Sequence, residues 1–114
     1  MKGNRLDEAL RRAAFTYNAA ADFYDALPLS FWNYFGARTV ELLALRPGSN
    51  VLDVCCGAGA SALPVARLVD PRGSVVGVDL AKELLVLART KATQQQPCEH
   101  SVRVRRYAVS AISK

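Results

Sequence analysis

The chain has 114 residues, of which 51% are hydrophobic and 22% charged, with a formal net charge of +5. This length is ordinary for one domain, and the composition excludes an intrinsically disordered chain. No apolar run approaches the roughly 18 residues that span a bilayer, and no apolar stretch follows the first basic residues. We therefore expect neither a transmembrane helix nor a secretory signal.

The excess positive charge lies in residues 89–114, where Arg103, Arg105 and Arg106 stand beside Tyr107. A basic tail with an aromatic side chain could hold phosphate or nucleic acid. The arginines also alternate with valines, as on a strand with one face in water. Because no nucleic-acid-binding motif accompanies them, we expect no nucleic acid partner.

The three cysteines are Cys55, Cys56 and Cys98, and His100 is the only histidine. Four zinc ligands at suitable spacing cannot be drawn from this set, so no metal site is expected. A catalytic pair of Cys98 and His100 would need a third group to orient it, and none is evident. The odd cysteine count without a signal sequence favours a cytoplasmic location.

Two helices are expected before residue 48. The first covers residues 5–25, where apolar residues recur at three- and four-residue steps. Leu27-Pro28 ends this pattern, and Ser30 could cap a second helix that runs to about Leu45. Eight of the nine aromatic residues lie between Phe15 and Phe35. The two helices could form a lid that faces a ligand pocket with Tyr17, Phe23, Tyr24 and Trp32. Alternatively, they could bury their aromatic faces on the rest of the chain.

The remainder alternates between strands and helices. Buried strands are expected at residues 51–55 and 74–79, helices at 60–69 and 81–94, and a third strand at 101–108. A loop at 46–50 and turns at 57–59 and 70–73 join these elements. This order predicts an α/β fold with a parallel, Rossmann-like sheet of two to three strands. The chain then divides into a helical segment, 1–48, and a partial Rossmann-like domain, 49–114.

The most informative motif is a glycine turn followed by a distant acid. Gly57 and Gly59 let the backbone turn tightly after the first strand and approach a ligand closely. Asp79 stands twenty residues after Gly59, at the end of the next strand, where a carboxylate can accept both hydroxyls of a ribose. Together these residues predict a nucleoside-binding site.

Two cofactors use such a site. Gly57-x-Gly59-x-x-Ala62 formally satisfies the dinucleotide fingerprint. Asp53, however, lies beneath the glycine turn, where its charge would repel a pyrophosphate and attract the ammonium of S-adenosylmethionine. Asp53 could instead only accept hydrogen bonds from the amides of the loop.

Residues 51–91 resemble the amino-terminal half of a class I S-adenosylmethionine-dependent methyltransferase, most closely the ubiquinone and menaquinone C-methyltransferase group. The first motif is matched by residues 52–59, the second by 76–80, and residues 17–48 resemble the family's N-terminal segment. The resemblance implies contacts of Asp53 with the methionine ammonium, of Gly57 and Gly59 with the methionine and ribose, of Asp79 with the ribose hydroxyls, and of Leu80 with the adenine. Cys55 stands where many relatives have glycine.

The resemblance is incomplete after residue 91. Family members place an acid after the third strand, but no acid follows Glu99 here, and the later strands of the family are absent. The first strand would then have an unpaired apolar edge. We expect the cofactor-binding half of a methyltransferase, inactive on its own, as a truncated chain or as a homo-oligomer that covers the bare edge. The methyl acceptor would be a small molecule, and the aromatic helices suit a flat or lipophilic one.

Two other functions remain open at this point. The chain could be a non-catalytic remnant of a methyltransferase domain that self-associates or binds a partner. It could also be a dinucleotide-binding module of the NAD type.

Overall fold

The computed structural model describes residues 2–69 and 72–95. Its elements are, in order, α1 (Lys2–Ala20), the 3-10 turns η1 (Ala21–Phe23) and η2 (Leu27–Leu29), α2 (Phe31–Leu42), β1 (Asn50–Val54), α3 (Ala62–Val69), β2 (Ser74–Val78) and α4 (Lys82–Gln94). The expected order of helices and strands is confirmed from α1 to α4. The expected third strand, the basic tail, Cys98 and His100 lie outside the described residues, as does half of the 70–73 turn.

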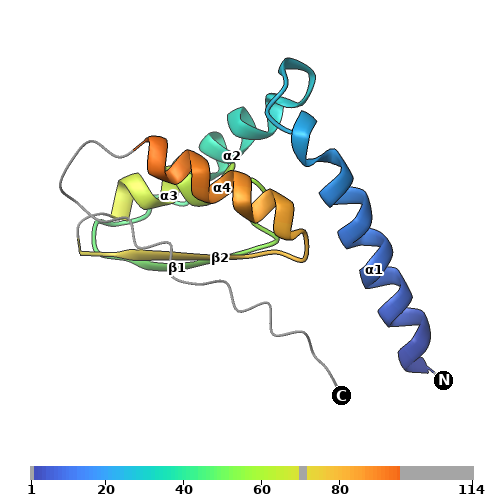
Figure 1. Ribbon diagram of the computed structural model, residues 1–114. Coiled ribbons are helices and arrows are strands. Elements are labelled where there is room, and N and C mark those ends of the chain that lie inside the picture. Colours follow the sequence, from blue (N-terminus) through green and yellow to red (C-terminus); the bar gives the residue numbers. More distant parts are fainter. Residues whose placement is uncertain (1, 70–71, 96–114) are drawn as a thin grey trace.

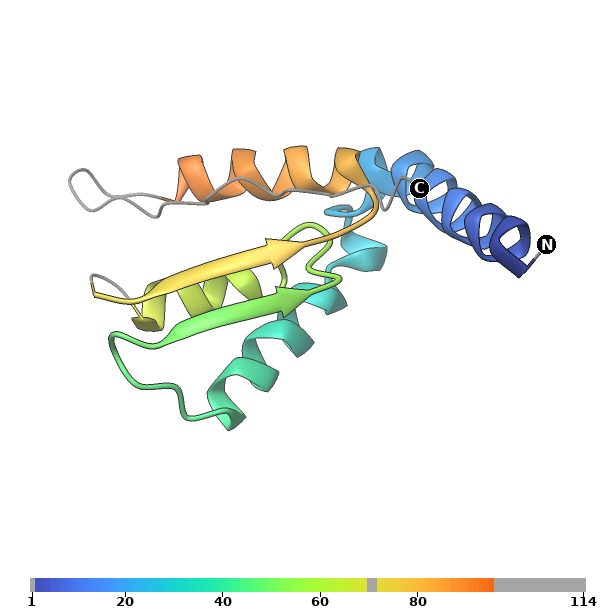
Figure 2. The ribbon, with the colours of Figure 1, turned by 90° about the horizontal axis from the view of Figure 1, so that it is seen from below.

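β1 and β2 form a parallel pair in which Val51 is level with Val75 and Asp53 with Gly77. The crossover between them is α3, as a βαβ unit requires. In Figure 1, α2, α3 and α4 all lie on the same side of this sheet, and Figure 2 shows the strands from the opposite side. The expected α/β fold with a parallel sheet is therefore confirmed.

The main core lies between the sheet and α3. Val65 and Val69 of α3 pack with Val75 of β2, Leu85 of α4 and Val40 of α2, and all five are buried. Because α2, α3 and α4 contribute to one cluster, the helices are fixed relative to the carboxyl ends of the strands. No helix in the described ranges is both long and apolar enough to cross a membrane.

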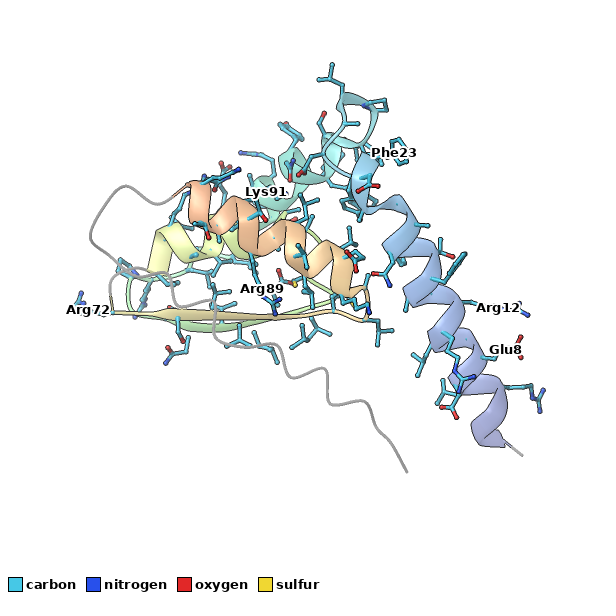
Figure 3. All side chains as sticks on the ribbon, in the orientation of Figure 1. Glu8, Arg12, Phe23, Arg72, Arg89 and Lys91 are labelled. Carbon is cyan, nitrogen blue, oxygen red and sulfur yellow. The ribbon has the colours of Figure 1, made fainter. Side chains whose placement is uncertain are left out.

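Among the residues that the structure describes, no element covers the other face of the sheet. Leu52 and Val54 of β1 are 62% and 65% exposed, and their register partners on the same face are Val76 and Val78. The expectation that the first strand is buried is therefore wrong for this face. The physical reason is the alternation of side chains along a strand, since no described element covers the second face. Figure 3 shows side chains extending from this face with no described helix beyond them.

Both expected N-terminal helices are present, but α1 ends at Ala20 instead of residue 25 and is followed by the 3-10 turn η1, and the expected cap of the second helix is wrong. Ser30 has helical dihedrals, with φ −64°, and makes no capping bond. Its hydroxyl instead donates to the carbonyl of Leu27 at 2.8 Å, which closes the preceding 3-10 turn. α2 ends at Leu42, three residues before the expected Leu45, because Ala44 has a φ of +48°.

Cys55 directly follows β1 and has a φ of +61°, in the left-handed region that favours glycine. For a residue with a Cβ this conformation costs about 1–2 kcal/mol, whereas glycine loses about 0.5–1 kcal/mol more in backbone entropy on folding. We therefore expect Cys55→Gly to leave the free energy of unfolding unchanged or to raise it by up to about 1 kcal/mol. Cys55→Val, which is β-branched, should lower it by about 1–2 kcal/mol.

Denaturant unfolding of the two variants checks this prediction. The comparison with valine is the control, because both substitutions remove the thiol and only one keeps a Cβ. A larger loss of stability for Cys55→Gly than for Cys55→Val would contradict the backbone explanation.

Candidate functional site

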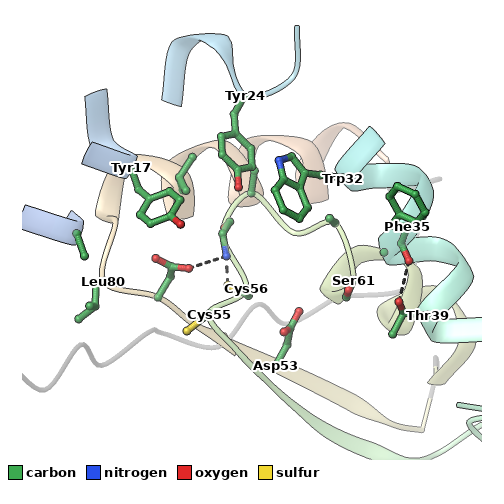
Figure 4. A pocket seen from close by; sticks show the side chains of 17 residues that line it. Tyr17, Tyr24, Trp32, Phe35, Thr39, Asp53, Cys55, Cys56, Ser61 and Leu80 are labelled. Carbon is green, nitrogen blue, oxygen red and sulfur yellow. Dashed lines mark hydrogen bonds between the residues drawn. The ribbon is translucent and has the colours of Figure 1, made fainter. Parts of the chain in front are cut away.

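A pocket of about 520 Å³ opens at the carboxyl ends of β1 and β2. Its floor is made by residues of the strand ends and the glycine loop, and its opposite wall by residues of α1 and α2 and by Tyr24, which follows η1. In Figure 4, Tyr17, Tyr24 and Trp32 lie on one side of this space, with Asp53 and Cys55 on the other. The volume is in the range of small-molecule and cofactor sites.

The glycine loop has the backbone geometry that the sequence predicts. Gly57 and Gly59 have φ values of +51° and +89°, and both residues are buried. Gly57 lines the pocket, but Gly59 is not among the lining residues. A Cβ on Gly59 would lie 3.0 Å from Cγ of Leu63, so this glycine serves the turn and its packing on α3.

Asp79 joins the end of β2 to the glycine loop. Its Oδ2 accepts a hydrogen bond from the backbone N–H of Gly57, and its Oδ1 accepts one from that of Ala81, both at 2.8 Å. The predicted association of the glycine turn with the distant acid is therefore present as a direct contact. Each carboxylate oxygen can accept a second bond, and the side chain lines the pocket together with Leu80.

Asp53 lines the same pocket but is less fully hydrogen-bonded than Asp79. Its Oδ2 is buried without a hydrogen-bond partner. Burial raises the pKa of this carboxyl above its ordinary value, the backbone N–H of Ala62 acts in the opposite direction, and the charge of Asp79 raises it further. The contact with the Ala62 amide agrees with the alternative that Asp53 only accepts hydrogen bonds from backbone amides, but it accounts for one carboxylate oxygen only. The other oxygen is an unmet acceptor that suits a cationic or N–H-bearing ligand.

Three of the four aromatic residues expected at a pocket line it. Tyr17, Tyr24 and Trp32 contribute to the wall, whereas Phe23 is 66% exposed and lies outside. Burial, and then the nearby Tyr17 and Asp79, raise the pKa of Tyr24. A tyrosine hydroxyl is already protonated at neutral pH at its ordinary pKa of about 10, so this one can donate a hydrogen bond. Phe35 completes the wall.

Four lining residues had no clear signal in the sequence, namely Ala13, Thr39, Ala60 and Ser61, whereas a fifth, Gly36, had one. Gly36 is the exception, because an isolated glycine inside a helical pattern indicates close packing. A Cβ there would lie 2.2 Å from the carbonyl oxygen of Ala60. α2 can therefore approach the glycine loop only with glycine at this position.

A model of the family described as protein-L-isoaspartate(D-aspartate) O-methyltransferase matches residues 6–106, which is most of the chain. The chain belongs to this family of S-adenosylmethionine-dependent methyltransferases. The resemblance inferred from the two motifs is thereby confirmed, and S-adenosylmethionine is the cofactor expected for this methyltransferase chain.

Curated relatives match this methyltransferase chain along most of its length. Nocamycin O-methyltransferase of Saccharothrix syringae is 35% identical over 77% of the chain, and 2-phytyl-1,4-naphtoquinone methyltransferase of Trichormus variabilis is 32% identical over 85%. The chain spans only 31% and 41% of the lengths of these two relatives. An S-adenosylmethionine-dependent methyltransferase of Aquifex aeolicus shares the fold with a TM-score of 0.54, at 23% identity, over 68% of this chain and 40% of its own.

The residues of the pocket fit the expected cofactor in three respects. Asp53 offers a buried, unmet carboxylate oxygen to an ammonium group. The buried backbone of Gly57 presents no side chain to the pocket, and Asp79 retains acceptor capacity for hydroxyls. A pyrophosphate would add negative charge beside two carboxylates, which the pocket does not balance with any basic side chain among its lining residues.

Asp53→Asn should stabilise the unliganded chain at neutral pH. A carboxyl whose pKa is raised on folding contributes stability that is complete below its unfolded pKa of about 3.9 and is lost as pH rises through the folded pKa. We therefore expect the melting temperature of Asp53→Asn to exceed that of the wild type near pH 7, with the difference disappearing near pH 4. Affinity for S-adenosylhomocysteine should fall about tenfold, since a charged acceptor is lost.

Thermal melts of both chains across this pH range check the prediction, and effects of the carboxylates that do not interact with Asp53 cancel in the difference. A difference that does not change with pH would contradict it.

Proposed function

We propose that this chain is the cofactor-binding half of an S-adenosylmethionine-dependent methyltransferase that acts on a small molecule, and that it is inactive on its own. The observation that carries the proposal is the pairing of two unlike carboxylates in one pocket. Asp79 is fixed to the glycine loop by two amides, whereas Asp53 keeps an unmet oxygen. This pair suits a ligand with a ribose at one end and an ammonium at the other.

Each predicted site residue then has a distinct role. Asp53 binds the ammonium, Gly57 lets the backbone approach the methionine and ribose, Asp79 accepts the ribose hydroxyls, and Leu80 packs on the adenine. Gly59, which does not line the pocket, acts through the shape of the turn, and its predicted contact with the cofactor stays a prediction. When bound, the cofactor supplies an electrophilic methyl group on a sulfonium. The contribution of the chain is to position the two reactants and to exclude water.

The acceptor is proposed to be flat, lipophilic and without negative charge. The wall of Tyr17, Tyr24, Trp32 and Phe35 supplies aromatic surface, and the two carboxylates would repel an anion. The names of two relatives, a nocamycin O-methyltransferase and a phytyl-naphthoquinone methyltransferase, support a small-molecule acceptor.

The proposal that the chain is incomplete rests on the sheet. A sheet face with Leu52, Val54, Val76 and Val78 on its surface is typical of one that another layer covers. β1 also pairs only with β2 among the described strands, which leaves its second edge open. Either further strands and helices of a longer protein or a second copy of the chain would cover this surface. The exposed thiol of Cys55 suits a reducing cytoplasm.

Calorimetric titration tests the cofactor. We expect S-adenosylhomocysteine to bind and NAD not to bind at the same concentrations. Preferential binding of NAD would overturn the assignment in favour of a dinucleotide module. Absence of binding by either ligand would overturn it in favour of a non-catalytic remnant.

The bare sheet face predicts self-association of the isolated chain. Light scattering should give a mass well above the 12.4 kDa of one chain. The double variant Leu52→Lys with Val54→Lys should reduce this mass, because association would have to bury the added charges. Leu6→Lys on the exposed side of α1 is the control and should leave the mass unchanged. A stable 12.4 kDa species at high concentration, with cooperative melting, would contradict the prediction.

A further inference from the structure

Residues 18–25 comprise the last residues of α1, the turn η1 and the two residues after it, and they contact α4 through two polar interactions. The backbone N–H of Glu83 donates to Oδ1 of Asn18 at 3.0 Å. Nζ of Lys91 lies 2.9 Å from Oδ1 of Asp25 in an ion pair. Both contacts join residues more than 60 positions apart in the sequence, so they are purely tertiary.

The first contact completes α4. The residue before the helix, Ala81, has no side-chain acceptor and makes no capping bond. Asn18 supplies the missing acceptor from another helix, to an amide in the first turn of α4. An interaction that a helix normally makes within its own segment therefore depends here on the position of α1.

The two contacts together fix an orientation. Glu83 and Lys91 are eight residues apart on α4, which corresponds to about 12 Å along the axis. One contact would act as a pivot, whereas two at this separation prevent rotation of the segment. Between them, Ala21 and Tyr24 pack on a small cluster of Ala58, Ala81 and Leu84.

Each polar contact directly follows a tyrosine of the pocket. Asn18 follows Tyr17, and Asp25 follows Tyr24. Both tyrosines line the pocket, and Figure 4 shows them above the space that Asp53 and Cys55 bound from below. Figure 3 shows Lys91 on α4, and this lysine makes the ion pair with Asp25, the residue after Tyr24.

We propose that Asn18, Asp25 and Lys91 are positioning residues that hold Tyr17 and Tyr24 over the pocket, so that retention of the cofactor depends on docking of residues 18–25 on α4. This inference rests on the proposed function. The apolar cluster beneath the segment is small, and the side chains of Lys91 and Asp25 are 15% and 37% exposed. The contacts of residues 18–25 with α4 are separate from the main core formed by α3 and the sheet, so we expect this segment to open without unfolding that core.

The test compares variants by stopped-flow measurement of S-adenosylhomocysteine release, using the fluorescence of Trp32, the single tryptophan. Lys91→Met should accelerate release about fivefold, and Asn18→Ala by a similar factor, since each removes one contact of modest strength. The exchanged pair Asp25→Lys with Lys91→Asp should restore slow release. Release from the conservative variant Asn18→Asp should stay as slow as from the wild type, because aspartate retains an acceptor at the N-terminus of α4.

Arg12→Met is the matched control. It breaks an exposed ion pair with Glu8 on α1, away from the pocket, and should leave release unchanged. Hydrogen exchange should quicken in residues 18–25 of Lys91→Met but not in α3 or β1, which separates opening of the segment from general loss of structure.

Unchanged release in both Lys91→Met and Asn18→Ala would overturn the inference while leaving the proposed function intact. So would fast release in both the exchanged pair and Asn18→Asp. Failure of the wild-type chain to bind S-adenosylhomocysteine would instead overturn the proposed function itself.

Discussion

Replacing Asp79 with alanine is expected to lower the affinity for S-adenosylhomocysteine by about 100-fold or more. A hydrogen bond to a charged acceptor contributes about 1.5–3 kcal/mol, and the proposed role gives Asp79 two bonds to the ribose. The substitution also removes the acceptor of the Gly57 and Ala81 amides, which fix the glycine loop against the end of β2. Calorimetric titration of the variant measures the loss directly.

Two further variants make the Asp79 experiment specific. Asp79→Asn keeps the shape and one acceptor but presents N–H groups to an amide, so its affinity should lie between those of the wild type and Asp79→Ala. Asp7→Ala removes an exposed acid of α1 outside the pocket and should have no effect. Affinity of Asp79→Ala within about threefold of the wild type, a difference under 1 kcal/mol, would refute the ribose assignment.

Gly36→Ala is expected to lower the free energy of unfolding by about 1–3 kcal/mol, the usual cost of forcing extra volume into a packed site. The added Cβ would lie 2.2 Å from the oxygen and 2.4 Å from the carbonyl carbon of Ala60. Backbone atoms cannot turn aside as a flexible side chain can, so α2 must move away from the glycine loop. Because α2 carries Trp32 and Phe35, the aromatic wall should move with it.

The sign of the Gly36 effect is diagnostic. Glycine to alanine inside a helix normally stabilises by about 1 kcal/mol, so a decrease identifies the tertiary contact as its cause. Asn33→Ala, at an exposed position of the same helix, reports the effect of propensity alone and should be neutral or mildly stabilising. Greater stability of Gly36→Ala in denaturant unfolding would contradict the close approach of α2 and the loop.

The residue patterns of the sequence were sufficient to predict the βαβα order, the turn at Gly57 and Gly59, and the proximity of Asp79 to that turn. These features follow from local rules. Apolar periodicity selects helices and strands, glycine permits a positive φ, and the carboxyl ends of neighbouring parallel strands meet at one edge of a sheet. The two motifs also identified the methyltransferase family, since they depend on short stretches of chain.

Other features were decided only by tertiary contacts. Which aromatic residues reach the pocket depends on the rotation of α1 and η1 against α4, which placed Tyr24 inside and Phe23 outside. The fold brings the backbone amide of Ala62 to Asp53 but leaves its Oδ2 without a hydrogen-bond partner. The bare face of Leu52 and Val54 shows the same dependence, because an apolar strand becomes buried on both faces only when another part of a structure lies against each of them.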